Sequence, residues 1–362
     1  MSPKKLTRAT AATAPSGVHG AADLPSVNIA SYNLEIRDAD GFVGDKASRG
    51  AFVDHLDGLR RHLRKSGGDP LKGETEGYGK KELEALFLNG DFREAALVLS
   101  AIEAFARSLA FVIARFARQK DWATVERIAV GGGFSDGRVG ELAIGRAGIL
   151  LRADGHDIDL APIRHHPDQA GLIGSVHLAP PWIFEAYDSI AAVDIGGSNI
   201  RAGIVELRQD KAADLGKARV WSFDLWRHSE EEPGRDAAIE RLGKMLNEQI
   251  KRARKKGLRV APFIGVGCPG RIEPDGTIDR GAQNLPGNWE SSRFNLVDSI
   301  RARVPRIGDH DTQIAMHNDA VIQGLSELPA MQDVETWAVL TIGTGLGNAS
   351  YHNKAGRPKR RG

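Results

Sequence analysis

Residues 189–206, SIAAVDIGGSNIRAGIVE, place a glycine turn between two apolar runs and constrain the fold more than any other stretch. β-Branched runs on either side of a Gly-rich turn predict a tight β-hairpin. Glycine lets the turn backbone approach another group closely, and successive exposed N–H groups can cradle a phosphate. Asp194, at the end of the first run, could then hold Mg²⁺, usually through water. An ordinary hairpin is the alternative for this stretch taken by itself.

Composition sets the class of protein in which this hairpin lies. The chain has 362 residues, of which 41% are hydrophobic and 27% charged, as is typical of a soluble globular protein with room for two domains. A net charge of +2 gives no reason to expect a nucleic-acid partner, and no apolar run reaches the roughly eighteen residues of a membrane span. Cys268 is the single cysteine, which excludes a zinc site built from several cysteines. We therefore expect a cytoplasmic protein without bound zinc and without a nucleic-acid or membrane partner.

Predicted strands and helices alternate along most of the chain. Short apolar runs at 127–137, 259–267 and 337–347 predict strands, two of which enter glycine turns. The longest predicted helix, at 92–119, has apolar residues on most of its faces and is expected to be a buried core helix. Such alternation predicts an α/β fold.

Three glycine turns follow apolar strands, namely GGGFSDG at 131–137, DIGGSN at 194–199 and GTGLG at 343–347. Together with GCPGRI at 267–272 and HNDA at 317–320, they resemble the ROK family of sugar kinases and their non-catalytic relatives. The resemblance covers residues 45 to 350. It implies an α/β, actin/hexokinase-like (ribonuclease H-like) ATPase fold, with two lobes on the same sheet plan and with ATP and sugar in the cleft between them.

The motifs stand in a different order from that of the family. A usual member begins with the DIGG turn and ends with the GGG turn and a GLIGAA-like helix, whereas here the GGG turn and GLIGSVHLA at 171–179 come first. Reading from the last residue on into the first restores the family order, so we interpret the chain as a circular permutant opened inside the second-lobe sheet. An unrelated N-terminal domain that mimics the second half is the alternative.

This interpretation divides the chain into three parts. Residues 1–25 lack periodicity and are expected to form a flexible tail. Residues 26–185 form a second-lobe portion with the adenosine-binding turn, which 331–362 complete; the basic segment from Tyr351 onward is expected to be frayed. Residues 186–330 form the first lobe, with the phosphate turn and the catalytic Asp.

The resemblance implies roles for single residues. Asp319 would be the catalytic base that accepts the proton of the attacking sugar hydroxyl, although Asp is also favoured as a helix N-cap. Asn318 and Asn284 would contact the sugar, with a plain turn residue as the alternative for Asn284. Arg201 fits the family pattern as an ion-pair partner rather than as a phosphate ligand. The nucleotide and its Mg²⁺ would be held by Asp194, by Gly196, Gly197 and Asn199 in the first phosphate turn, by Gly343, Thr344 and Gly345 in the second, and by Gly131, Gly132 and Gly133 in the adenosine turn.

Two features of the family are missing from this sequence. Many members carry a Gly-Glu-x-Gly-His segment that holds sugar hydroxyls, followed by a Cys-rich zinc loop, and His19 and Glu35 are the candidate stand-ins for that segment. The resemblance still favours an ATP-dependent sugar kinase that phosphorylates a hydroxyl of a hexose or hexose derivative, with ATP and Mg²⁺ as cofactors. A homodimer is compatible with this interpretation. A non-catalytic ROK-like sugar-binding or regulatory protein is the alternative.

Overall fold

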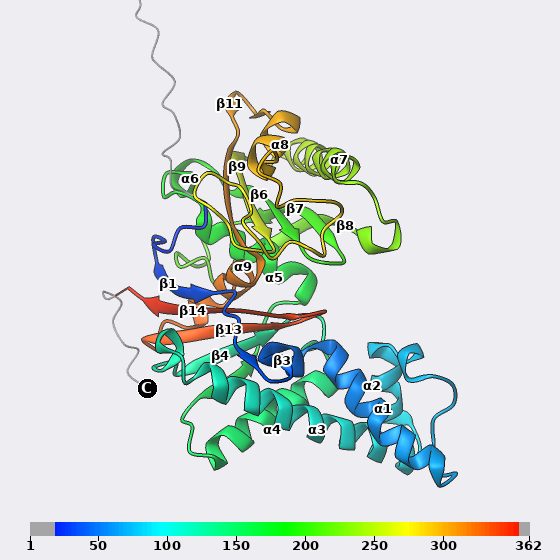
Figure 1. Cartoon of the computed structure of the whole chain (residues 1–362). Helices are drawn as coiled ribbons and strands as arrows, with labels where there is room; N and C mark the ends of the chain where they lie inside the picture. The colour runs from blue at the N-terminus through cyan, green and yellow to red at the C-terminus, as the bar shows by residue number, and fades with distance from the viewer. Residues whose placement is uncertain (1–18, 355–362) are drawn as a thin grey trace, which may run out of the picture.

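The computed structural model describes residues 19–354 and confirms the predicted hairpin as two adjacent strands of a five-stranded sheet (Figure 1). The hairpin strands and the next strand pair antiparallel, and two further strands add in parallel on the other side. In spatial order this first sheet consists of β12 (Gln313–Asn318), β9 (Val260–Cys268), β6 (Ser189–Ile195), β7 (Ile200–Glu206) and β8 (Arg219–Trp226).

A second five-stranded sheet joins segments that are far apart along the chain. An N-terminal strand and a C-terminal strand pair antiparallel at one edge, although they lie at opposite ends of the described chain. In spatial order the second sheet consists of β1 (Val27–Tyr32), β14 (Leu346–Asn353), β13 (Thr336–Ile342), β4 (Arg127–Gly131) and β5 (Asp159–Pro162). The remaining strands form two short hairpins, β2 (Arg37–Asp38) with β3 (Gly41–Phe42), and β10 (Arg306–Ile307) with β11 (His310–Asp311).

Both sheets follow one plan. In the first, β6, β7 and β8 form an antiparallel meander, β9 and β12 add in parallel, and a helix follows. In the second, β13, β14 and β1 form the meander, β4 and β5 add in parallel, and again a helix follows. The strand order of the second sheet matches that of the first only if the chain is read from β14, at its C-terminal end, on into β1, at its N-terminal end. This repeat supports our proposal that the chain order is circularly permuted.

The two sheets divide the interior into three apolar cores, because alternate residues of their strands face opposite sides. Two helices cover the outer face of the first sheet, four cover the outer face of the second, and α5 and α9 lie between the sheets (Figure 1). The helices are α1 (Arg49–Lys65), α2 (Lys80–Asn89), α3 (Phe92–Phe116), α4 (Arg138–Ala153), α5 (Pro167–Gly174), α6 (Ile183–Ala186), α7 (Arg235–Lys255), α8 (Leu296–Arg303) and α9 (Asp319–Leu325).

The small residues of the segment 171–179 allow close helix packing. A Cβ at Gly174 would lie 1.7 Å from the carbonyl oxygen of Ile322, so α5 contacts α9 backbone to backbone. After Gly174 the segment continues as a 3₁₀ turn, Ser175–Leu178. This contact holds the central helices, and with them the two sheets, against each other.

The longest helix, α3, is a core helix. A capping box closes its N-terminus, where Asp91 accepts from the backbone N–H of Glu94 and Glu94 accepts from that of Asp91. Within the part of the chain that the structure describes, α3 alone is long and apolar enough to cross a membrane by length and composition. More than half of its most apolar window is buried, as expected for a core helix.

The inner ends of both predicted tails are ordered by long-range contacts. Gly20 donates its backbone N–H to the carbonyl of Met316, and Leu24 is buried in the central core. Tyr351, predicted to be frayed, lies in β14, stacks on Trp337 with ring centroids 3.9 Å apart and donates its hydroxyl to Val321. The rest of each predicted tail, 1–18 and 355–362, lies outside the described residues.

Candidate active site

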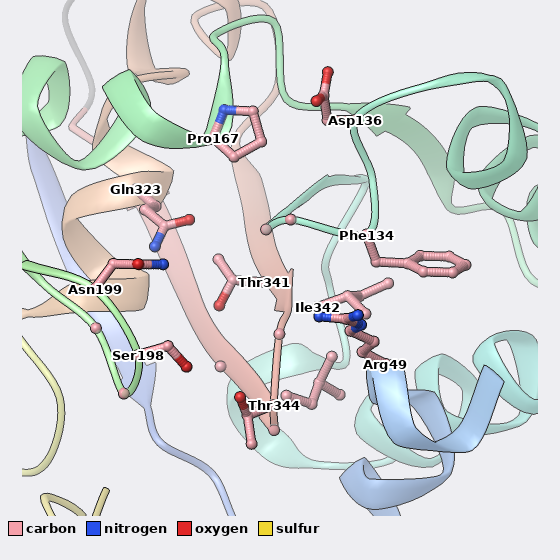
Figure 2. Close-up of a pocket in the computed structure, with 18 of the residues that line it drawn as sticks. Arg49, Phe134, Asp136, Pro167, Ser198, Asn199, Gln323, Thr341, Ile342 and Thr344 are labelled. Carbon is pink, nitrogen blue, oxygen red and sulfur yellow. The ribbon is translucent and has the colours of Figure 1, made fainter. Parts of the chain in front are cut away.

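A cleft of about 730 Å³ lies where the two lobes face each other, and all three glycine turns line it (Figure 2). The sequence predicted that these turns converge despite their separation along the chain, and the structure confirms it. The predicted residues that line the cleft are Gly132, Gly133, Gly196, Gly197, Asn199, Asn284, Asp319, Gly343, Thr344 and Gly345.

Each phosphate turn is closed by its own backbone. In the β6–β7 turn, Gly196 donates its N–H to the carbonyl of Asn199 at 2.8 Å. In the β13–β14 turn, Gly343 donates in the same way to Gly345 at 2.9 Å. The turns lie on opposite lobes and face one space, which is the arrangement expected if both contact one extended anion.

The glycines of the adenosine turn serve different purposes. Gly132 has φ +89°, and a Cβ there would lie 2.3 Å from the Ile342 carbonyl, so the fold itself requires this glycine. Gly131 is buried against Ile163 and does not line the cleft, unlike its two neighbours. Gly133 is exposed, and no atom lies within 4 Å of the Cβ it lacks. The fold does not need a glycine at 133, so the open space there is available to a ligand.

Asp319 lines the cleft as the first residue of α9. The N-cap is Asn318, whose Oδ1 accepts from the backbone N–H groups of Ala320 and Val321, so the cap alternative for Asp319 is wrong. Removal from water and, to a smaller extent, the nearby negative charge of Asp194 together raise the pKa of the Asp319 carboxyl to about 7. A carboxylate with a pKa near neutrality is well matched to accepting a proton at physiological pH.

The structure does not bring Asn318 to the cleft as a sugar contact. Its side chain is fully buried, and its Nδ2 donates to the Gly270 carbonyl at 3.0 Å and to Asn33 Oδ1 at 3.3 Å. Asn33 itself lines the cleft with φ +50°, a region that asparagine tolerates better than most residues. Asn284 lines the cleft beside Gly197. The cleft lining therefore carries an amide side chain at Asn33 and none at Asn318.

Asp194 lies below the cleft surface in an ion-pair network. Its Oδ2 accepts from Arg201 Nη1 at 3.0 Å, and Arg201 also pairs with Asp168 at 2.6 Å, which confirms the ion-pair interpretation of Arg201. Asp194 Oδ1 has no hydrogen-bond partner and faces Gly171, where a Cβ would lie 2.5 Å from it. Burial raises the pKa of Asp194, while Arg201 opposes that shift.

This geometry does not fit Asp194 as a direct magnesium ligand. One carboxylate oxygen is bound to a guanidinium, and the other is turned toward α5 rather than toward the cleft. Over residues 19–354 no group of three or more His, Cys, Asp or Glu side chains is arranged to hold a metal ion. Asp194 is therefore not placed to bind Mg²⁺ directly in the cleft.

The cleft also contains residues that the sequence analysis did not assign. Arg49, Phe134 and Gln323 line it (Figure 2), as does Lys80, which pairs with Asp136. Phe134 belongs to the GGGFSDG turn at 131–137, whereas the positions of Arg49, Lys80 and Gln323 depend on contacts between distant segments that the glycine turns do not encode.

The two candidate stand-ins for the missing sugar clamp are not in the cleft lining. His19 accepts from the backbone N–H of Met316 through Nδ1 at 3.2 Å, and burial lowers its pKa. Glu35 follows β1 outside the lining. Neither of them replaces the Glu/His segment at this site.

Comparisons with known proteins point to one family. Residues 190–357 match the model of the ROK family, which confirms the resemblance over that part of the chain and, with it, the two-lobed actin/hexokinase-like α/β fold. Similar solved structures are the Lmo2764 protein from Listeria monocytogenes (26% identity, 48% of this chain, 52% of that chain, TM-score 0.33), a ROK hexokinase from Thermus thermophilus (24%, 48%, 51%, 0.32) and a ROK family glucokinase from Streptomyces griseus in complex with glucose and AMPPNP (23%, 47%, 47%, 0.34). The match thus spans about half the length of each of these structures. A search of the curated proteins found no match.

Proposed function

We propose that this chain, whose residues 190–357 match the ROK family, is an ATP-dependent sugar kinase. It transfers the γ-phosphate of ATP to a hydroxyl of a hexose or hexose derivative. The observation that carries the proposal is the Asp319 carboxylate, with its pKa near 7, in a cleft lined by three backbone turns on two lobes.

Phosphoryl transfer asks the protein mainly for positioning and charge stabilisation, with a base near the nucleophile. In the proposed reaction, Asp319 accepts the proton of the sugar hydroxyl while the hydroxyl oxygen forms a bond to the γ-phosphorus. The bond from the γ-phosphorus to the bridging oxygen breaks, and ADP leaves with the electron pair. The turns at 196–199 and 343–345 hold the phosphates through backbone N–H groups, and Asn33 and Asn284 orient the sugar near Asp319.

One observation favours the alternative of a non-catalytic sugar-binding or regulatory protein. Neither His19 nor Glu35 lines the cleft, so the usual Glu/His clamp on the sugar is not replaced at its expected place. A protein of this kind would bind a sugar without releasing ADP.

A coupled ADP-release screen with Mg-ATP and a panel of hexoses, hexosamines and N-acetylated hexosamines tests the proposal. The kinase is expected to release ADP with at least one sugar and far more slowly without it. Sugar binding detected by calorimetry, with no sugar-dependent ADP release across the panel, would contradict the kinase and support the alternative.

The pH dependence of turnover follows from the raised pKa of Asp319. Only the ionised carboxylate accepts a proton, and its pKa of about 7 lies above the ordinary value of 3.8. Therefore kcat/KM, which reports the free enzyme, is expected to fall about tenfold for each pH unit below 7. A profile measured from pH 5 to 9 checks this. If kcat/KM stays level down to pH 5, the base has an ordinary pKa and is not Asp319 as the structure places it.

Replacement of Gly133 by valine is expected to weaken nucleotide binding without loss of stability. The fold leaves the space at Gly133 empty, so the side chain fills only room that a nucleotide would use. Overpacking typically costs about 1–3 kcal/mol, so the Kd of a non-hydrolysable ATP analogue should rise about ten- to a hundredfold. Calorimetry gives the Kd, and a thermal melt gives Tm.

Gly132→Val is the matched control for this variant. Its positive φ and the close Ile342 backbone predict a lowered Tm, which Gly133→Val should not show. If Gly133→Val binds the analogue as tightly as the original protein, the nucleotide does not approach this turn.

A further inference from the structure

The basic side chains of the cleft differ in whether they are already neutralised. Among the described residues, three cations line the cleft, namely Arg49, Lys80 and Arg201. Arg201 pairs with two aspartates, Asp168 and Asp194, and Lys80 pairs with Asp136. Within the described part of the chain, no carboxylate lies within ion-pair distance of Arg49. Arg49 is therefore the lining cation with its charge available to a ligand.

The backbone of Arg49 is fixed to one of the phosphate turns. It is the first residue of α1, and its N–H donates to the carbonyl of Gly343 at 3.0 Å. Phe52 and Val53, three and four residues further on, also line the cleft, so this face of α1 forms a wall of it. The guanidinium thus belongs to the wall that adjoins the turn at 343–345.

The side chain of Arg49 lies across the cavity from the first phosphate turn. Figure 2 shows it beside Ile342, on the side of the cavity that Phe134 also lines, with Ser198 and Asn199 opposite. A triphosphate that contacts both phosphate turns would occupy the cavity that Arg49 also lines. The backbone N–H groups of the turns carry only partial charges, so a full positive charge next to them would stabilise a polyanion strongly.

We propose that Arg49 binds the phosphate tail of the nucleotide. The guanidinium presents two parallel N–H donors to the phosphate oxygens. It also supplies a positive charge, whereas the charges of Lys80 and Arg201 are already neutralised by aspartates. This inference rests on the proposed nucleotide-dependent function, and it adds a phosphate-binding residue that the glycine motifs do not contain.

Calorimetric titration of the purified protein with a non-hydrolysable ATP analogue and with adenosine tests the proposal. Arg49→Met is expected to weaken binding of the analogue about ten- to a hundredfold, because charge-assisted hydrogen bonds to phosphate are lost, and to leave adenosine binding unchanged. Arg49→Lys keeps the charge without the fork and should recover part of the affinity. Arg61→Met is the matched control, because Arg61 lies on the same helix, is exposed and pairs with Asp57.

The outcomes separate this inference from the function on which it rests. If the original protein binds the analogue and Arg49→Met binds it equally well, the Arg49 proposal is overturned while the nucleotide site stands. If Arg49→Met weakens the analogue and adenosine alike, the residue acts on the nucleoside, and the phosphate assignment is wrong. If the original protein binds neither compound, the nucleotide site itself is wrong, and the Arg49 proposal is overturned with it.

Discussion

Asp319→Asn is expected to lower kcat about 10²- to 10⁴-fold, the usual contribution of a positioned general base. The substitution is nearly isosteric and removes the proton acceptor. It leaves the start of α9 intact because Asn318, not Asp319, caps that helix. Affinity for an ATP analogue should change little, since the phosphate turns consist of other residues. Steady-state kinetics with the sugar found by the screen, together with a thermal melt, measure these effects.

Asp236→Asn is the matched control for this experiment. Asp236 also lies in the first turn of a first-lobe helix, but it is exposed and outside the cleft. It should keep both turnover and Tm. An Asp319→Asn protein with unchanged kcat would remove Asp319 from the mechanism, and one that unfolds would show that the carboxylate is structural.

Arg201→Met is expected to lower the free energy of unfolding by about 3–5 kcal/mol, the usual result of removing one partner of a buried ion pair. Arg201 is the sole hydrogen-bond donor to Asp194 among the contacts of the described residues, and Asp194 is almost fully buried. Without the guanidinium, the carboxylate must stay charged in an apolar setting or take up a proton. Denaturant unfolding at pH 7 measures the loss.

Two further variants and the pH dependence identify the cause of that loss. Arg219→Met removes an exposed pair with Glu206 in the same sheet and should cost no more than about 1 kcal/mol. Asp194→Asn should restore part of the stability of Arg201→Met. The deficit should also shrink as the pH falls, because burial raises the pKa of Asp194 and the folded variant then binds a proton that the unfolded chain does not. A loss as small as that of Arg219→Met would mean that Asp194 carries no charge in the folded protein.

Local patterns in the sequence predicted the elements of the fold well. The β6–β7 hairpin, the strands that enter glycine turns and the long apolar helix each depend on residues that are neighbours along the chain. The N-cap of α9 could not be assigned from sequence, because Asn318 and Asp319 are both favoured caps and only the backbone conformation decides between them. The Tyr351 strand was missed because its partners, Trp337 and β1, lie elsewhere in the chain.

The candidate site was predictable only where motifs carry it. Glycine turns are recognisable in the sequence, so it was possible to predict from them that Gly133, Gly197 and Gly345 line the cleft. The burial of a side chain is not visible in the sequence. The sequence therefore did not predict that Asp194 and Asn318 are buried outside the cleft lining. Arg49 reaches the cleft through a backbone contact with Gly343, which no local pattern encodes.

Direct identification of the products tests whether the protein transfers a phosphoryl group from ATP to a sugar with Asp319 as the base. The original protein and Asp319→Asn are incubated with Mg-ATP and the sugar found by the screen, and the mixtures are analysed by mass spectrometry. We expect the original protein to form ADP and a sugar monophosphate in equal amounts, and the variant to form them at most about one hundredth as fast. ADP without a phosphorylated sugar, or equal product from both proteins, would contradict this expectation.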